Sequence, residues 1–169
     1  MVSDEEEATA LFKEARNHQL NGCYDLARIG YLRAARLADA ARALGVHANA
    51  RAGLVEVDRA TQRYDEVLRY ADDALALCNA FGTPARLASL LECKAHALTE
   101  TNQWIDARVA WRQAKKAMSD AGWIGWQVGV CDSKIAEASE HISKAVRAER
   151  LAAGPDVSRR KLFGRRWVR

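Results

Sequence analysis

Apolar and polar positions alternate along the chain with the spacing of amphipathic helices, and the arrangement recurs every 40 residues. Tyr24, Tyr64 and Trp104 mark this recurrence. Each aromatic residue follows a polar turn, and a small apolar residue and an alanine come three and ten positions after it. A fixed period of roughly 20–50 residues is typical of stacked repeats, in which each unit buries its apolar face on its neighbour. The pattern therefore predicts a helical solenoid.

Capping residues and helix breakers predict where the helices begin and end. Ser3 and Glu6 have the spacing of a capping box, and Thr83-Pro84 supplies a cap and a first-turn proline. We expect Gly45 to close the second helix. The expected helices cover, in order, residues 4–20, 24–44, 47–61, 64–81, 84–101, 104–121 and 124–153.

The connections between these helices have only two to four residues, so consecutive helices must lie antiparallel. We expect an all-α, right-handed helical-repeat solenoid of about three antiparallel helix pairs, closed by a long C-terminal capping helix. The solenoid should cover residues 1–154, with repeats at about 4–44, 46–82 and 83–122 and the cap at 124–153. Residues 155–169 form a separate basic tail.

The composition agrees with one soluble, helical domain: 49% of the 169 residues are hydrophobic, 28% are charged and only two are proline. The acidic start, residues 1–7, is unlike a secretory signal, and no apolar stretch reaches the length of about 18 residues that a transmembrane helix needs. We therefore expect a cytoplasmic protein without a transmembrane segment. Its four cysteines are widely spaced, and we expect them to be reduced, buried and without disulfides: Cys23, Cys78, Cys93 and Cys131.

The repeated units resemble tetratricopeptide repeats, which place small residues where their two helices cross and an aromatic residue near the start of the second helix. The crossing positions are Ala15, Val55 and Ala95 in the first helices, and Ala27/Tyr31/Ala34, Val67/Ala71/Ala74 and Ala107/Trp111/Ala114 in the second. The match covers residues 8–121. Its period exceeds the usual length of about 34 residues and is more similar to the repeats of bacterial regulators and kinesin-light-chain-like adaptors. HEAT-like repeats are the alternative.

The resemblance implies a concave face, lined by the first helix of each pair, on which ligands lie. The residues that we expect to line this groove are Phe12, Arg16, Gln19, Asn49, Glu56, Arg59, Glu92, His96 and Thr99. A polar lining with one large aromatic residue suits a peptide or helical segment of a partner protein. The expected function is a non-enzymatic protein–protein interaction module: an adaptor, assembly factor or regulator.

Catalytic and metal-binding patterns are weak in this sequence. Cys93 and His96 lie one helical turn apart, as do Glu137 and His141, but a zinc site needs three or four converging ligands. The chain contains no glycine-rich phosphate loop, H-E-x-x-H or G-x-S-x-G motif. We therefore expect no catalytic residue, no metal and no cofactor.

The positive charge is concentrated near residue 169. Residues 1–155 carry a net charge of −1, whereas residues 156–169 carry +5. The residues of interest in this basic tail are Arg159, Arg160, Lys161, Phe163, Arg165, Arg166, Trp167 and Arg169. Cations interleaved with aromatic residues suit a nucleic acid, an acidic protein or an anionic lipid surface, and a merely solvated terminus is the remaining interpretation. The alternative function is thus a nucleic-acid-associated protein with the solenoid as its platform.

The last expected helix carries its apolar stripe further than the stack can cover. Ile135, Ala138, Ile142, Ala145 and Val146 lie on this stripe. Either the helix folds back along the sixth helix, or it pairs with a second copy of the chain, in which case a homodimer forms through residues 135–152.

Overall fold

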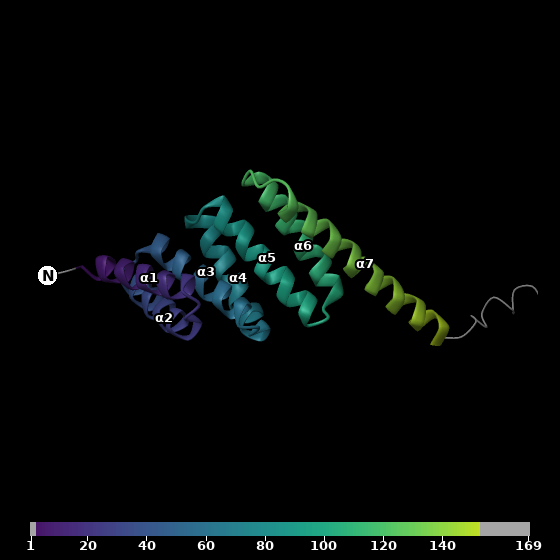
Figure 1. Cartoon of the computed structure of the whole chain (residues 1–169), viewed down its shortest axis with the longest axis horizontal. Coiled ribbons are helices and arrows are strands. Elements are labelled where there is room, and N and C mark those ends of the chain that lie inside the picture. Colours follow the sequence, from purple (N-terminus) through teal and green to yellow (C-terminus); the bar gives the residue numbers. More distant parts are fainter. Residues whose placement is uncertain (1–2, 153–169) are drawn as a thin grey trace, which may run out of the picture.

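The computed structural model describes residues 3–152 and contains seven helices and no strand within that range. The helices are α1 (Asp4–Leu20), α2 (Tyr24–Ala40), α3 (Leu44–Ala60), α4 (Tyr64–Phe81), α5 (Pro84–Glu100), α6 (Trp104–Asp120) and α7 (Trp126–Ala152). Figure 1 shows them stacked along the long axis of the molecule, with α1 and α2 near one end and α7 at the other. The expected all-α solenoid is confirmed. No described helix combines the length and apolar character needed to cross a membrane.

The predicted caps are present at the start of two helices. The Glu6 backbone N–H donates to the Ser3 hydroxyl over 3.2 Å, and the Ser3 N–H donates to the Glu6 carboxylate over 2.9 Å. Thr83 caps α5 by accepting the backbone N–H of Arg86 at 3.2 Å. These bonds satisfy N–H groups that the first turn of a helix leaves without a partner.

The helices α1 to α6 begin at residues 4, 24, 44, 64, 84 and 104, so each starts 20 residues after the one before it. Five of the turns between helices hold a residue with positive φ: Gly22 (74°), Arg42 (56°), Gln62 (59°), Asn102 (59°) and Gly122 (77°). The N–H of the next residue then reaches the carbonyl five positions back, as from Arg63 to Asp58 at 2.8 Å. This pattern is the Schellman motif, which ends a helix by left-handed backbone.

Three helix boundaries differ from the prediction. Helix α2 ends at Ala40 rather than at residue 44, because the left-handed conformation of Arg42 stops it. Helix α3 consequently begins at Leu44 instead of residue 47, and Gly45 lies in its first turn rather than closing α2. Helix α7 begins two residues later than expected, because Gly125 has a φ of 82°.

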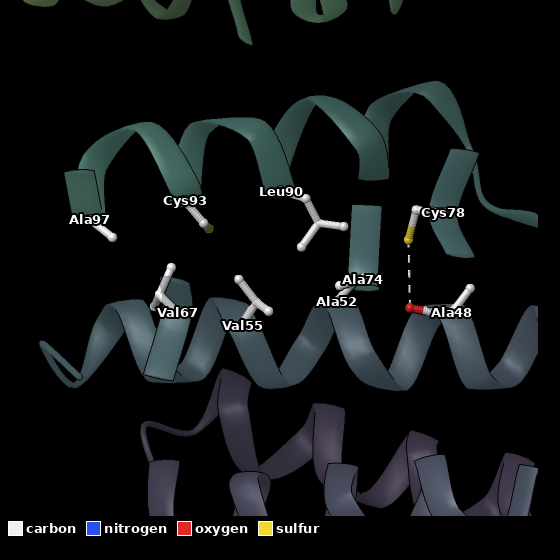
Figure 2. Close-up of a cluster of buried hydrophobic side chains, with 9 residues drawn as sticks. All are labelled: Ala48, Ala52, Val55, Val67, Ala74, Cys78, Leu90, Cys93 and Ala97. Carbon is white, nitrogen blue, oxygen red and sulfur yellow. Dashed lines mark hydrogen bonds between the residues drawn. The ribbon is translucent and has the colours of Figure 1, made fainter. Parts of the chain in front are cut away.

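Within the described residues, the core consists of four clusters of buried hydrophobic side chains distributed along the stack. Ala15, Val55 and Ala95, at the predicted crossing positions, are completely buried. Figure 2 shows one part of this core, where side chains of α5 point toward those of α3. Its members are Ala48, Ala52, Val55, Val67, Ala74, Cys78, Leu90, Cys93 and Ala97. Because the cluster joins α3, α4 and α5, neighbouring units stabilise one another, as in other solenoids.

Large and small side chains complement each other where α2 meets α3. Tyr31 is buried, and a Cβ atom added to Gly53 would lie 2.4 Å from its ring. One repeat later, the corresponding positions hold Ala71 and Cys93. The first helix of the third unit thus accommodates a larger residue, Cys93, because the second helix of the middle unit carries a smaller one, Ala71.

A buried ion pair also joins α2 to α3. Arg28 Nε donates to Asp58 Oδ1 at 2.7 Å, and the Asp58 side chain is completely buried. Burial raises the pKa of Asp58, while the nearby Arg28 guanidinium opposes this shift. The pair therefore fixes the position of α2 on α3 at an appreciable desolvation cost.

Candidate functional site

Polar side chains from two neighbouring helices, α1 and α5, converge on Glu56 of α3. Helix α3 contacts both α1 and α5. Glu56 Oε1 accepts hydrogen bonds from Arg86 Nη1 at 2.7 Å and from Ser89 Oγ at 3.0 Å, while Oε2 accepts from Gln19 Nε2 at 3.4 Å. One carboxylate thus connects the first helices of all three repeats. We refer to Gln19, Tyr31, Glu56, Arg86 and Ser89 as the Glu56 network.

Tyr31 orients the first member of this network. Its hydroxyl donates to Gln19 Oε1 at 2.6 Å, so the amide of Gln19 is held between Tyr31 and Glu56. Burial raises the pKa of Tyr31 to about 12, and the phenol therefore keeps its proton at neutral pH. These two hydrogen bonds hold the Gln19 side chain in one orientation beside Glu56.

A pocket of about 170 Å³ opens beside the network. Its lining residues are Arg16, Gln19, Leu20, Tyr31, Glu56 and Arg86. Arg16 is exposed and makes no ion pair with any residue in the range 3–152. Phe12, one turn earlier on α1, is half-buried with its ring 5.8 Å from that of Tyr31. The pocket therefore presents an uncommitted cation next to an aromatic surface.

A second polar cluster lies one to two turns further along α3 and α5. The His96 ring stacks on the Tyr64 ring with their centroids 5.9 Å apart. Burial lowers the pKa of His96 and raises the pKa of Glu92, although the Arg59 guanidinium opposes the shift of Glu92. Both Arg59 Nε and His96 Nδ1 are buried without a hydrogen-bond partner in the part of the chain described. These atoms have donor or acceptor capacity that the fold leaves unused.

The structure groups most, though not all, of the predicted groove residues. Arg16, Gln19 and Glu56 meet at the pocket, and Arg59, Glu92 and His96 meet in the second cluster. Thr99 does not line the groove, because it is buried and its hydroxyl accepts the Nε1–H of Trp111 at 2.9 Å. Asn49 is half-buried and belongs to neither group.

The prediction missed Tyr31 and Arg86 as parts of the site. The sequence pattern indicates a core role for Tyr31, and it is the hydroxyl that joins this residue to the Glu56 network. Arg86 lies three residues before Ser89 on α5, which places both side chains on one helix face. Ser89 in turn lies three residues before Glu92, an expected groove residue, so this i, i+3 series is the signal that could have found Arg86.

No protein-family model matches the sequence, and no curated protein matches it either. Among solved structures, the fold is similar to the crystal structure of a TPR-like protein from Chlorobium tepidum TLS, with a TM-score of 0.60 and 21% sequence identity. The similarity covers 82% of this chain and 93% of that one. The fold is a TPR-like helical repeat. At this identity the likeness concerns the fold alone.

The two residue pairs considered for catalysis, Cys93 with His96 and Glu137 with His141, take part in packing and ion pairing in this TPR-like fold. Burial raises the pKa of Cys93 to about 12, so its thiol stays protonated and is a poor nucleophile. Glu137 accepts a hydrogen bond from Lys134 at 2.8 Å, whereas His141 stacks on Trp104 with ring centroids 3.8 Å apart. Within residues 3–152, no three His, Cys, Asp or Glu side chains are grouped so that they could hold a metal ion.

The remaining predictions concern the cysteines, the basic tail and the apolar stripe. Cys23 is exposed in the turn after α1, contrary to expectation, whereas the other three cysteines are buried. The basic tail, residues 155–169, lies outside the described range. Helix α7 packs on α6 through Cys131 and Ile135, so the first part of the stripe lies along the sixth helix, as in the first of the two expected arrangements. Pairing with a second copy through residues 135–152 stays a prediction.

Proposed function

We propose that this chain is a non-enzymatic protein-interaction module. It holds a peptide or helical segment of a partner protein on the groove that α1, α3 and α5 form. The observation that carries this proposal is the Glu56 network, because three donors from two other first helices hold one carboxylate at the centre of this face. Such a connected surface is rigid, and a rigid surface loses little entropy when a ligand binds.

The chemistry of the pocket indicates which groups the ligand should present. Both oxygens of Glu56 already accept hydrogen bonds, so this carboxylate has little capacity left for a cationic ligand. Arg16 is exposed and uncommitted, and it favours a ligand with backbone carbonyls or carboxylates near this point. The half-buried ring of Phe12 provides an adjacent apolar contact.

A random-peptide phage library selected on the purified full chain tests the proposal. The test variant is Arg16→Glu, and the matched control is Arg112→Glu, an exposed arginine of α6. Peptides selected on the wild type should bind Arg16→Glu at least about tenfold more weakly, which corresponds to ~1.4 kcal/mol. Their affinity for Arg112→Glu should stay unchanged. Equal affinity for the two variants would show that this face is not the peptide site.

A further inference from the structure

An apolar groove lies between the N-terminal end of α6 and the C-terminal half of α7, well separated in sequence from the Glu56 network. Its volume is about 420 Å³. The lining residues that matter here are Ile105, Asp106, Ile142, Ala145, Val146 and Glu149. The ring stack of Trp104 on His141 also borders it, and we refer to it as the α6–α7 groove. Its lining includes two carboxylates and neither lysine nor arginine.

The order of the helices explains why this groove is open. In the three repeats, each first helix packs against the second helix that follows it: α1 on α2, α3 on α4 and α5 on α6. Helix α7 occupies the position of a fourth first helix, and no described element follows it. Large apolar side chains therefore stay uncovered, with Ile105 63% exposed and Val146 41% exposed.

We propose that residues 153–169 fold back over the α6–α7 groove and cover its apolar lining. This segment follows Ala152 directly, only three residues after Glu149 of the groove. Gly154-Pro155 breaks the helical pattern and favours a turn at this point. The returning segment takes the place that the second helix of a fourth repeat would fill.

The length of the segment is sufficient for this return. From Ala152 back to His141 the helix rises ~16 Å at about 1.5 Å per residue. A fully extended segment of the 17 residues from 153 to 169 would span ~56 Å at about 3.3 Å per residue. Because the segment is tethered beside the groove, its effective concentration there is on the order of millimolar.

The chemistry of the segment also fits the groove. Leu162, Phe163, Trp167 and Val168 can supply apolar contacts, and six cations accompany them. Asp106 and Glu149 provide carboxylates at the groove that attract these cations. The docking involves a surface other than the proposed peptide site, and it stands independently of the proposed function.

Limited trypsin digestion of the full chain tests this docking, because Arg165 and Arg166 are cleavage sites inside the segment. Ile105→Arg places a positive charge in the groove at a side chain that is 63% exposed, and it should leave the fold intact. Ile29→Arg on α2, where the side chain is 55% exposed, is the matched control. A synthetic peptide of residues 153–169 gives the cleavage rate of the unprotected segment.

The wild type and Ile29→Arg should be cleaved after Arg165 and Arg166 about tenfold more slowly than the peptide. Cleavage of Ile105→Arg should approach the rate of the peptide, while its circular dichroism melting curve matches that of the wild type. Cleavage of the wild type at the rate of the peptide would overturn the proposal. Protection that grows with protein concentration, together with a doubled mass in sedimentation, would also overturn it and assign the groove to a second copy.

Discussion

Replacing Gln62 by glycine should stabilise this protein, although glycine usually weakens helical proteins. Gln62 lies in the turn between α3 and α4 with a φ of 59°, a left-handed conformation in which the Cβ atom crowds the following carbonyl. Its side chain is exposed and makes no hydrogen bond to the residues described. The substitution therefore removes backbone strain and little else. Gln113→Gly is the matched control, because Gln113 is exposed in the interior of α6.

The expected magnitudes follow from the two backbone conformations. A non-glycine residue in the left-handed region costs about 1–2 kcal/mol, and glycine costs about 0.5–1 kcal/mol of additional chain entropy on folding. Gln62→Gly should therefore raise the free energy of unfolding by about 0.5–1 kcal/mol. In the helix, where no strain is relieved, Gln113→Gly should lower it by about 0.7–1 kcal/mol. Gly22→Ala, the reverse change in an equivalent turn, should be destabilising by about 1 kcal/mol.

Urea denaturation followed by circular dichroism measures these differences, because the midpoint shifts while the slope m stays constant when only stability changes. The two Gln→Gly variants should shift the midpoint in opposite directions. If Gln62→Gly lost as much stability as Gln113→Gly, left-handed strain would not be present in this turn. A changed m-value would instead indicate an altered native or denatured state.

Three further substitutions, one of them with a matched control, probe the packing of the helices and the pH dependence. Arg28→Met leaves the completely buried Asp58 carboxylate without its partner. Urea denaturation should show that the free energy of unfolding falls by about 3–5 kcal/mol. A loss below about 1 kcal/mol would contradict the pairing. Gly53→Ala forces a Cβ atom to 2.4 Å from the Tyr31 ring and should lower the free energy of unfolding by about 1–3 kcal/mol. In the control Gly129→Ala the added Cβ atom meets nothing within 4 Å, so the free energy of unfolding should stay the same or rise. Burial lowers the pKa of His96 from its ordinary value of 6.5. The imidazole therefore binds a proton more readily in the unfolded chain than in the folded one. The free energy of unfolding consequently falls as the pH drops below 6.5. His96→Gln should flatten this dependence in denaturation curves measured at about pH 5 and 7, and an unaltered slope would contradict it.

The sequence predicted the helices best where a side chain acts locally. The Ser3 capping box and the Thr83 cap depend on neighbours within the same turn, so both are visible in the sequence. The end of α2 is different, because Arg42 adopts a conformation usually taken by glycine. Gly45 lies only three residues further along and is the more obvious helix breaker. The predicted end of α2 was therefore placed too late in the sequence.

The candidate site was predictable as far as repeat positions determine it. Arg16, Gln19 and Glu56 share a face because the repeat places equivalent positions on adjacent first helices. Thr99 occupies the position equivalent to Gln19, yet it turns inward because the buried indole of Trp111 needs an acceptor. This requirement arises only when two helices pack together, and the spacing of residues along the chain does not reveal it.

The convergence on Glu56 has a consequence for the mechanics of the molecule. Solenoids bend and twist through small rotations between repeats, and here such a rotation would separate Arg86 from Glu56 and Gln19 from Glu56. The hydrogen bonds of the Glu56 carboxylate therefore resist rotation between the repeats and hold the curvature of the stack. The curvature of the three repeats should be the same with and without a ligand.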